Sequence, residues 1–394
     1  MKSKSNLFVC STQYAILNAI NLISNDPEKK YSNSDIVIFH QTDGIKELSE
    51  MIKKNKVFHD VYDFPFINNK NLIYLIGIIL FPKFFLERVC LSGSNFSPKG
   101  NFYNKIFSQN QLYASLFSRF NKDADVYLIE DGLSSYTGRT LEVARRSFLF
   151  RLINKTFLRR YFFADIKGQA LYRPEMLCGP SRAIIKLPEH KITNNCIYNS
   201  IFKYKKTDVY DVHKFVYLGV PYYGLRDLMI KPESVSFDFE KSCKIIVDTA
   251  MNSLSKKDFI YRTHPIEKIE ISHYKNLCKV DECENMWELE CQNKISDDHI
   301  LMSFFSTAAF TPKMLYGKQP YVIFLYKILG LEMLNADKLV FGLRAMYSAP
   351  KKIIVPETIC ELVEVISGLE LLRNSKNTRE SVMSNYGTSH KRLA

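Results

Sequence analysis

The sequence has no apolar run long enough to cross a bilayer. Its longest apolar stretch, residues 72–81, is about half the length that a membrane-spanning helix requires. Residues 1–6 are polar, and the apolar run that follows them, Leu7–Cys10, is only as long as a strand, which is not the pattern of a secretory signal peptide. These absences predict a cytoplasmic protein that neither spans a membrane nor follows a classical secretion route.

The sequence also lacks paired cysteines and recognisable metal-ligand spacings. Its nine cysteines are an odd number and include no CxxC pair, which predicts reduced thiols in the cytosol. A zinc site can be drawn from His273, Cys278, Cys283 and Cys291, but this spacing fits no known ligand pattern. We therefore expect no bound metal.

Negative charge is in deficit. The chain carries 54 lysines and arginines against 41 acidic residues, for a formal net charge of +13. No zinc-finger spacing, RNP-like strand or KH loop accompanies this charge, so we expect no nucleic-acid partner. An anionic membrane surface, anionic small substrates, or a lysine-rich composition without any partner remain as explanations.

One segment concentrates the positive charge. Residues 145–160 interleave arginine and lysine with apolar residues at helical spacing. This pattern predicts a basic amphipathic helix in peripheral contact with the anionic inner face of the membrane. A core helix whose outer face is basic fits the pattern equally well.

The length and apolar content predict two α/β domains. At 394 residues with 46% hydrophobic residues, the chain suits two domains of about 150–200 residues each. Short β-rich runs alternate with helical stretches in both halves, which favours parallel sheets covered on both faces. The expected strands are residues 7–10, 35–39, 88–91, 126–129, 214–218, 258–262, 299–303 and 320–324. The expected helices are residues 13–23, 237–253 and 313–316, and the polar segment 204–212 is the expected linker.

The first candidate site is Glu130-Asp131-Gly132, directly after the strand expected at 126–129. Two adjacent acids at a strand end point to opposite sides, so one can face a cleft while the other holds the turn. Repulsion and partial burial raise the pKa of the acid in the cleft, which suits a general base. Gly132 permits a tight turn and a close approach of substrate. An ordinary acidic turn would give the same tripeptide.

The second candidate site is Arg262-Thr263-His264-Pro265, where another strand runs into a His-Pro pair. The proline holds the histidine in an extended conformation at the strand end. There His264 can donate a hydrogen bond to a phosphate or protonate it as it departs, while Arg262 adds positive charge from the other face. A structural histidine is the alternative.

Two further features favour nucleotide binding. Ser306 and Thr307 stand at an expected helix start, where hydroxyls and backbone N–H groups bind anions, although an ordinary helix cap has the same composition. Pro312 lies six residues beyond Ser306 and is expected to kink this helix or restart it at Thr311. Glu288 can accept hydrogen bonds from both hydroxyls of a ribose, or it can be a surface helix residue.

The order of these motifs resembles that of bacterial sialyltransferases of glycosyltransferase families 52 and 38. Those families carry an Asp/Glu-Asp/Glu-Gly motif, a His-Pro motif and a Ser/Thr pair, and the motif match extends over about residues 7–325. Residues 10–13, Cys-Ser-Thr-Gln, also look like the opening of family 52 members. The departures from the family pattern are Phe305, where a second serine is often found, and Pro312.

The resemblance implies a GT-B fold, with two Rossmann-like doubly wound domains facing a central cleft. Residues 1–205 would bind the acceptor, and residues 206–394 the donor, CMP-sialic acid, without a metal or other cofactor. The implied roles are catalysis by Glu130, His264 and Asp131, donor binding by Arg262, Glu288, Ser306, Thr307 and Gly219, and acceptor binding by Thr12, Gln13 and Gly132. The acceptor would be an oligosaccharide or glycolipid of lipooligosaccharide or capsular polysaccharide.

The mechanism that follows is one displacement with inversion, in which Glu130 takes the proton of the acceptor hydroxyl and His264 stabilises the departing CMP. Asp123-Ala-Asp125 formally matches a metal-binding Asp-x-Asp, but it precedes a strand instead of ending one. The alternatives are another donor (a different nonulosonic acid, Kdo or an NDP-hexose) or a non-catalytic binding protein of the same pathways.

Overall fold

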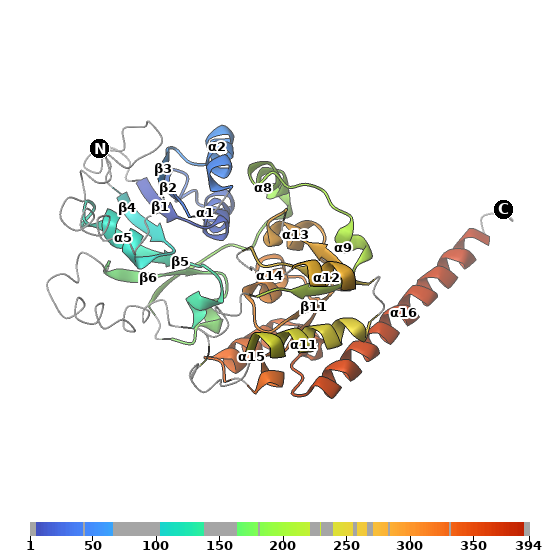
Figure 1. Ribbon diagram of the computed structural model, residues 1–394. Coiled ribbons are helices and arrows are strands. Elements are labelled where there is room, and N and C mark those ends of the chain that lie inside the picture. Colours follow the sequence, from blue (N-terminus) through green and yellow to red (C-terminus); the bar gives the residue numbers. More distant parts are fainter. Residues whose placement is uncertain are drawn as a thin grey trace. The chain divides into compact units, whose positions relative to one another are not determined.

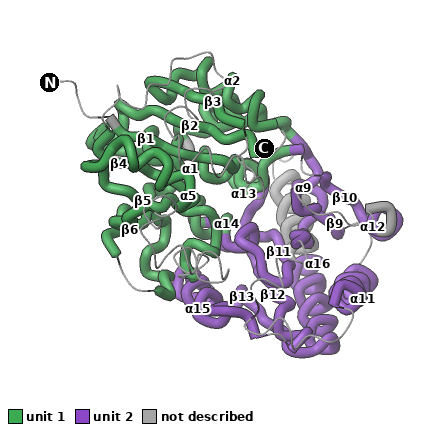
Figure 2. The backbone as a smooth tube through the Cα atoms, turned by 60° about the vertical axis from the view of Figure 1, so that its left-hand side comes forward, with its two compact units in different colours: residues 1–206, 285–293, 311–317 green, residues 207–284, 294–310, 318–394 purple. Residues whose placement is uncertain are grey.

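The computed structural model describes residues 5–41, 44–65, 103–137, 164–179, 182–220, 229, 239–254, 258–265, 271–282, 284–330 and 332–389. The chain divides into two units, each built on its own parallel sheet (Figures 1 and 2). Unit 1 comprises residues 1–206, 285–293 and 311–317, and unit 2 comprises residues 207–284, 294–310 and 318–394. The expected boundary between residues 205 and 206 lies one residue before the first of these divisions. Because two later segments group with unit 1, the units are not continuous in sequence.

Unit 1 holds a seven-stranded parallel sheet in the order β3-β2-β1-β4-β5-β6-β7. Its strands are β1 (Ser5–Cys10), β2 (Ser34–His40), β3 (Val61–Pro65), β4 (Tyr103–Ser108), β5 (Asp125–Ile129), β6 (Ile166–Leu171) and β7 (Ala183–Lys186). Its α-helices are α1 (Gln13–Asn25), α2 (Ile45–Asn55), α5 (Gln111–Ser118), α8 (Asn195–Ile201) and α13 (Trp287–Asn293). Short 3-10 turns cover Leu133–Tyr136, Pro174–Met176 and Ile192–Asn194.

The central strands of unit 1 are buried on both faces. All four residues of the apolar run Leu7–Cys10 are 0% exposed. Phe8 of β1 stacks on Phe107 of β4 with ring centroids 4.8 Å apart, and Phe39 of β2 stacks on Tyr113 of α5 at 4.1 Å. Strands that are covered on both sides read as continuous apolar runs instead of alternating patterns, which is why the sequence marks β1 and β2 clearly.

Unit 2 holds a six-stranded parallel sheet in the order β10-β9-β8-β11-β12-β13. Its strands are β8 (Phe215–Leu218), β9 (Phe259–Arg262), β10 (Lys279–Asp281), β11 (Ile300–Ser303), β12 (Tyr321–Phe324) and β13 (Ile353–Ile354). The helices of this half are α9 (Val209–Val212), α11 (Phe239–Asn252), α12 (Ile271–Leu277), α15 (Ala336–Met346) and α16 (Ile359–Ser389), with 3-10 turns at Tyr326–Leu329 and Pro350–Lys352. Helix α14 (Thr307–Tyr316) begins in unit 2, and its residues from Thr311 onward group with unit 1.

The strand order reverses once in each sheet. In unit 1 the chain proceeds from β1 outward to β3 on one side, then from β4 to β7 on the other. In unit 2 the same reversal separates β8 from β11. The predicted pair of Rossmann-like doubly wound domains is thereby confirmed. Ligands of such sheets bind beside the carboxyl ends of the strands at the reversal, so each unit offers one such edge.

Three local expectations differ from the structure or fall outside it. Helix α14 continues through Pro312 from Thr307 to Tyr316, so the predicted restart at Thr311 does not occur. The expected linker at 204–212 contains the short helix α9. The strand expected at 88–91 lies outside the described residues.

Candidate functional site

The carboxyl ends of β1 and β4 are joined by the side chain of Gln109. Its Oε1 accepts hydrogen bonds from the backbone N–H of Ser11 at 3.0 Å and of Thr12 at 3.3 Å. Its Nε2 donates to Ser11 Oγ at 3.0 Å. These bonds bridge the point where the strand order of unit 1 reverses. No sequence pattern marks Gln109, because only the pairing of β1 with β4 brings residues 11 and 109 together.

Thr12 connects this edge to the acidic motif. Its Oγ1 accepts a hydrogen bond from the N–H of Ala15 at 3.2 Å, which caps helix α1, and donates to Asp131 Oδ1 at 3.1 Å. Gln13, the first residue of α1, is partly exposed. The predicted acceptor residues Thr12 and Gln13 therefore lie at the same edge as the predicted acids.

Asp131 is the partly exposed acid of the pair. Its backbone N–H donates to Ser135 Oγ at 2.9 Å, which holds the turn after β5. Burial raises the pKa of its carboxyl, and the hydroxyl of Thr12 opposes that rise. Gly132 has φ of 82°, a backbone conformation that disfavours any side chain, so the tight turn predicted at this residue is present.

Glu130, the other acid, is 0% exposed. Its Oε1 accepts a hydrogen bond from the hydroxyl of Tyr14 at 2.8 Å. Its Oε2 accepts one from the hydroxyl of Tyr136 and one from the backbone N–H of Tyr172 at 2.9 Å. Both carboxylate oxygens are thus occupied by groups of the protein. The direct contact with an acceptor hydroxyl that we expected for Glu130 is not available in this geometry.

The environment of Glu130 nevertheless suits a base at neutral pH. Burial raises the pKa of its carboxyl to about 7, although hydrogen bonds from Tyr136, Tyr172 and Tyr14 lower it, and the neighbouring Asp131 adds a smaller rise. Burial is the largest cause because the charged form loses its hydration. A carboxylate with this pKa accepts a proton far more readily than a surface glutamate does.

This raised pKa predicts a pH dependence of stability. Between the ordinary value of 4.5 and about 7, the folded protein retains a proton at Glu130 that the unfolded chain releases. The stabilisation is complete below the unfolded value and is lost as the pH rises through the folded one. We therefore expect the wild-type midpoint of thermal unfolding, measured by circular dichroism, to fall more between about pH 5 and pH 7.5 than that of Glu130→Gln.

Two buried histidines do not obscure that comparison. Burial lowers the pKa of His190 to about 3 and of His299 to about 4, below the ordinary value of 6.5, so each makes the protein more stable as the pH rises toward 6.5. This contribution is the same in the wild type and in the variant, so it cancels from the comparison. Parallel pH dependences of the wild type and the variant would contradict the raised pKa of Glu130.

A buried polar network holds α1 against β5 and β6. Asn18 Nδ2 donates to the backbone carbonyl of Glu130 at 3.0 Å. The hydroxyl of Tyr172, which directly follows β6, donates to Asn18 Oδ1 and contacts His190 Nε2, each at 2.8 Å. Asn21 Nδ2 donates to that same hydroxyl at 3.0 Å. Because these groups are buried and paired, the network fixes the helix that carries Tyr14.

The predicted donor residues of unit 2 lie at its carboxyl edge. Gly219 directly follows β8, and its N–H donates to the carbonyl of Arg262 at 2.9 Å. His264 follows β9 and is partly exposed, and burial lowers the pKa of its imidazole. A neutral imidazole can donate a hydrogen bond to a phosphate, so of the two roles expected for His264 this one fits better.

The Ser306-Thr307 pair opens helix α14, as expected. Thr307 is the first helical residue, and Ser306 Oγ accepts a hydrogen bond from the N–H of Ala308 at 3.2 Å. Both residues come shortly after the carboxyl end of β11 at Ser303, beside the strand reversal of unit 2, and both are partly exposed. Ser306 therefore caps the helix, and its hydroxyl hydrogen is still able to reach an anion.

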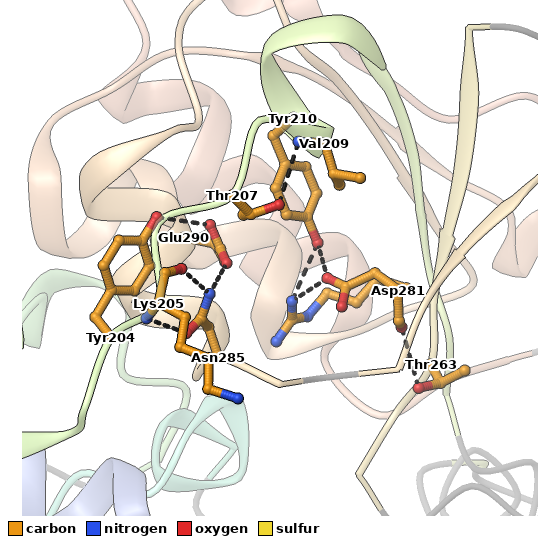
Figure 3. Close-up of polar contacts among 10 residues, drawn as sticks. Tyr204, Lys205, Thr207, Val209, Tyr210, Thr263, Asp281, Asn285 and Glu290 are labelled. Atoms are coloured by element: carbon orange, nitrogen blue, oxygen red, sulfur yellow. Dashed lines mark hydrogen bonds and ion pairs between the residues drawn. The ribbon is translucent and has the colours of Figure 1, made fainter.

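Arg262, an expected donor contact, forms buried contacts within unit 2 in this geometry. It is 5% exposed, and its Nη1 forms an ion pair with Asp281 Oδ2 of β10. The same nitrogen donates to the hydroxyl of Tyr210 at 3.0 Å. Figure 3 shows the hydroxyl of Tyr210 directed at Asp281, and Thr263 Oγ1 donating to the carbonyl of Asp281 at 3.3 Å. The guanidinium of Arg262 therefore binds residues of unit 2.

Glu288 groups with unit 1, which differs from its predicted place in the C-terminal domain. Its charge raises the pKa of Tyr14, Tyr172 and Tyr316, so it lies near the tyrosines around Glu130. Helix α13 is tied to unit 1 by buried polar contacts of Asn285, whose Nδ2 donates to Glu290 Oε1 at 2.6 Å and to the carbonyl of Lys205 at 2.8 Å (Figure 3).

Two other expectations, the contact with a membrane and the absence of a metal, are not tested by the geometry of the site. The basic segment 145–160 lies outside the described residues. Within those that are described, no helix is long and apolar enough to cross a membrane. Among the described residues, Asp35, His59 and Asp60 lie close enough to one another to ligate a metal. Asp125, of the Asp-x-Asp sequence, is the first residue of β5 and forms an ion pair with Lys167 at 2.6 Å.

Comparison with known proteins gives likeness in structure only. No protein-family model and no curated protein matches the chain. A sialyltransferase from Photobacterium damsela is 11% identical, with a TM-score of 0.45 over 90% of this chain and 82% of that one. A UDP-glucosyltransferase from Polygonum tinctorium is 7% identical, with a TM-score of 0.46 over 93% and 90%. A UDP-N-acetylglucosamine 2-epimerase from Rickettsia bellii is 10% identical, with a TM-score of 0.43 over 93% and 96%. Likeness at this level carries no functional argument, and the fold stated above rests on the strand orders.

Proposed function

We propose that the chain is a glycosyltransferase that moves sialic acid from CMP-sialic acid to a hydroxyl of a surface glycan, with inversion and without a metal. The observation that carries the proposal is Glu130, a buried carboxylate with a pKa near neutrality at the carboxyl end of a central strand. Transfer to a hydroxyl requires a group that accepts the proton of that hydroxyl, and the raised pKa of Glu130 suits this role.

The carboxyl edge of unit 2 supports an anionic donor. The first turn of α14 presents backbone N–H groups, and the positive end of the helix dipole lies there. Gly219 lies at the end of β8, which is the neighbour of β11 in the sheet. His264 lies at the end of β9, which is the next strand beyond β8. We assign the CMP phosphate to this edge, with Ser306, Thr307 and His264 as its hydrogen-bond donors.

The reaction proposed is a single displacement. The acceptor oxygen attacks the anomeric carbon as its proton is released toward Glu130 as the final acceptor, and the bond from that carbon to the phosphate oxygen breaks with its electron pair leaving on CMP. His264, as a neutral donor, stabilises the charge that grows on the phosphate. The acceptor proposed is an oligosaccharide or glycolipid of lipooligosaccharide or capsule, and the excess of positive charge suits anionic substrates.

A donor panel tests the proposal. The full chain is incubated in EDTA with CMP-N-acetylneuraminic acid, UDP-sugars or GDP-sugars, and with galactosylated acceptors, and nucleotide release is measured. We expect release of CMP alone, unaffected by chelation. We expect His264→Ala to slow that release by on the order of 10²-fold, since it removes a donor to the phosphate.

The other outcomes separate the alternatives. Release from a diphosphate donor alone, or release that requires added metal, would retain the transferase and overturn the sialic acid donor. Absence of release from every donor in the panel would overturn the proposed function in favour of another nonulosonate donor or a binding protein. A His264→Ala variant as fast as the wild type would remove that residue from the donor site.

A further inference from the structure

We propose that Tyr14 is a catalytic residue that relays the proton of the acceptor hydroxyl to the buried carboxylate of Glu130. This inference rests on the proposed transferase function and adds a residue to it. A base that is 0% exposed cannot touch a substrate itself, so the proton needs an intermediate group. The hydroxyl of a tyrosine can supply that step because it both accepts and donates a proton.

Of the three groups described as donating to the carboxylate of Glu130, Tyr14 is the one that is partly exposed. Tyr136 is 0% exposed and Tyr172 is 1% exposed, and Tyr172 contributes its backbone N–H. Tyr14 lies in the first turn of α1, directly after the predicted acceptor residues Thr12 and Gln13. Its hydroxyl donates to Glu130 Oε1 at 2.8 Å, whereas Oε2 already accepts two hydrogen bonds. The route to Glu130 therefore runs through Oε1.

The relay conserves atoms and charge. The O–H bond of the acceptor breaks, and its proton forms a new O–H bond on Tyr14. The original O–H bond of Tyr14 breaks, and that proton forms an O–H bond on Glu130 Oε1. The electron pair stays on the acceptor oxygen and forms the new glycosidic bond, while the leaving group departs with the pair of the bond that breaks. Tyr14 is a neutral phenol before and after the step.

The surroundings of Tyr14 require the two transfers to be concerted. Its pKa is raised well above the ordinary value of 10.0, first by burial and then by Glu130, Tyr172, Tyr136 and Glu288. A free tyrosinate is therefore strongly disfavoured, so Tyr14 cannot hold a negative charge between two separate steps. Asp131 is the remaining acid beside Glu130, and its repulsion favours the protonated form of Glu130.

The test compares three tyrosine-to-phenylalanine variants of the full chain. CMP-N-acetylneuraminic acid is the first probe, followed by the UDP- and GDP-sugars, each with a galactosylated acceptor. We expect Tyr14→Phe to lower kcat by on the order of 10²-fold with little change in KM, as the loss of one proton-transfer group does. Tyr113→Phe is the matched control, because it removes a buried hydroxyl from α5 in the same unit, and we expect it to keep the wild-type rate.

Tyr136→Phe separates a relay from mere support of Glu130. It also removes a hydrogen bond that lowers the pKa of Glu130, so it should move the pH profile of kcat upward while keeping more activity than Tyr14→Phe. For the wild type, kcat should depend on the fraction of deuterium in the solvent with a quadratic curve, because two protons move together.

The results that overturn the relay are distinct from those that overturn the function. A wild type that turns over a donor, with Tyr14→Phe within threefold of its kcat, would discard the relay and keep the transferase. A linear deuterium dependence, or equal losses in Tyr14→Phe and Tyr136→Phe, would do the same. A wild type without activity on any donor would overturn both. Infrared titration of the Glu130 carboxyl tests the contact without any donor: an unchanged pKa in Tyr14→Phe would overturn the hydrogen bond on which the relay depends.

Discussion

Replacement of Glu130 by glutamine is expected to lower kcat by on the order of 10²–10⁴-fold, the usual contribution of a general base. Glutamine keeps the size of the side chain, but its amide cannot accept the proton of the acceptor. Because Glu130 is 0% exposed, substrate binding at the surface should change little, so the loss should fall on kcat more than on KM. Steady-state kinetics with the donor identified by the panel measures both constants.

Asp125→Asn provides the matched control for that variant. Asp125 stands at the opposite end of β5, pairs with Lys167 at the surface, and has no role in the proposed reaction. We expect it to retain the wild-type kcat. A Glu130→Gln variant with wild-type kcat, together with an inactive Asp131→Asn, would transfer the role of base to the partly exposed acid. That result would leave Glu130 as a structural group.

Replacement of Arg262 by alanine is expected to lower the free energy of unfolding by about 3–5 kcal/mol, since it leaves a carboxylate without its partner in a poorly hydrated site. Asp281 would keep the hydroxyl of Tyr210 and some access to water, its side chain being 15% exposed. Urea unfolding followed by circular dichroism measures the change. Arg262→Met with Asp281→Leu, which removes both charges, should recover part of the loss.

Lys275→Ala is the control for this variant. Lys275 pairs with Glu282 at 2.6 Å, but both side chains are more than half exposed. Such pairs contribute up to about 1 kcal/mol. A loss on Arg262→Ala no larger than that of the control would show that the pair is dispensable for stability and would favour the expected role of Arg262 in donor binding.

The sequence identifies the strands of the two sheets best where they are buried on both faces. The runs expected at 7–10, 35–39 and 214–218 are within one residue or two of β1, β2 and β8. The sequence does not predict strand β6, because its residues are determined by how they pack against the neighbouring strands and show no periodic pattern. A Cβ atom at its Gly168 would lie 1.9 Å from the carbonyl oxygen of Ala183 in β7, so only glycine fits there. No local pattern reports that constraint.

The motifs identified the edges of the sheets but not the environment of each side chain. Glu130, His264 and Ser306 do follow strands at carboxyl ends, where the patterns put them. Which of the two acids turns inward depends on Tyr14 and Tyr136, one of them more than a hundred residues away in the chain. The partner of Arg262 is on β10, a three-residue strand that the sequence does not mark. Such contacts follow from tertiary packing, which composition and spacing do not encode.

The single tryptophan of the chain can serve as a fluorescence probe for the surroundings of Glu130. Trp287 opens α13, is 6% exposed and precedes Glu288, whose charge affects the tyrosines around Glu130. Its emission therefore originates from unit 1 alone, without a contribution from any indole of unit 2. Fluorescence quenching and lifetime measurements on the unmodified protein can follow ligand binding in that unit, and a tryptophan placed in unit 2 of a Trp287→Phe background would report on the other unit separately.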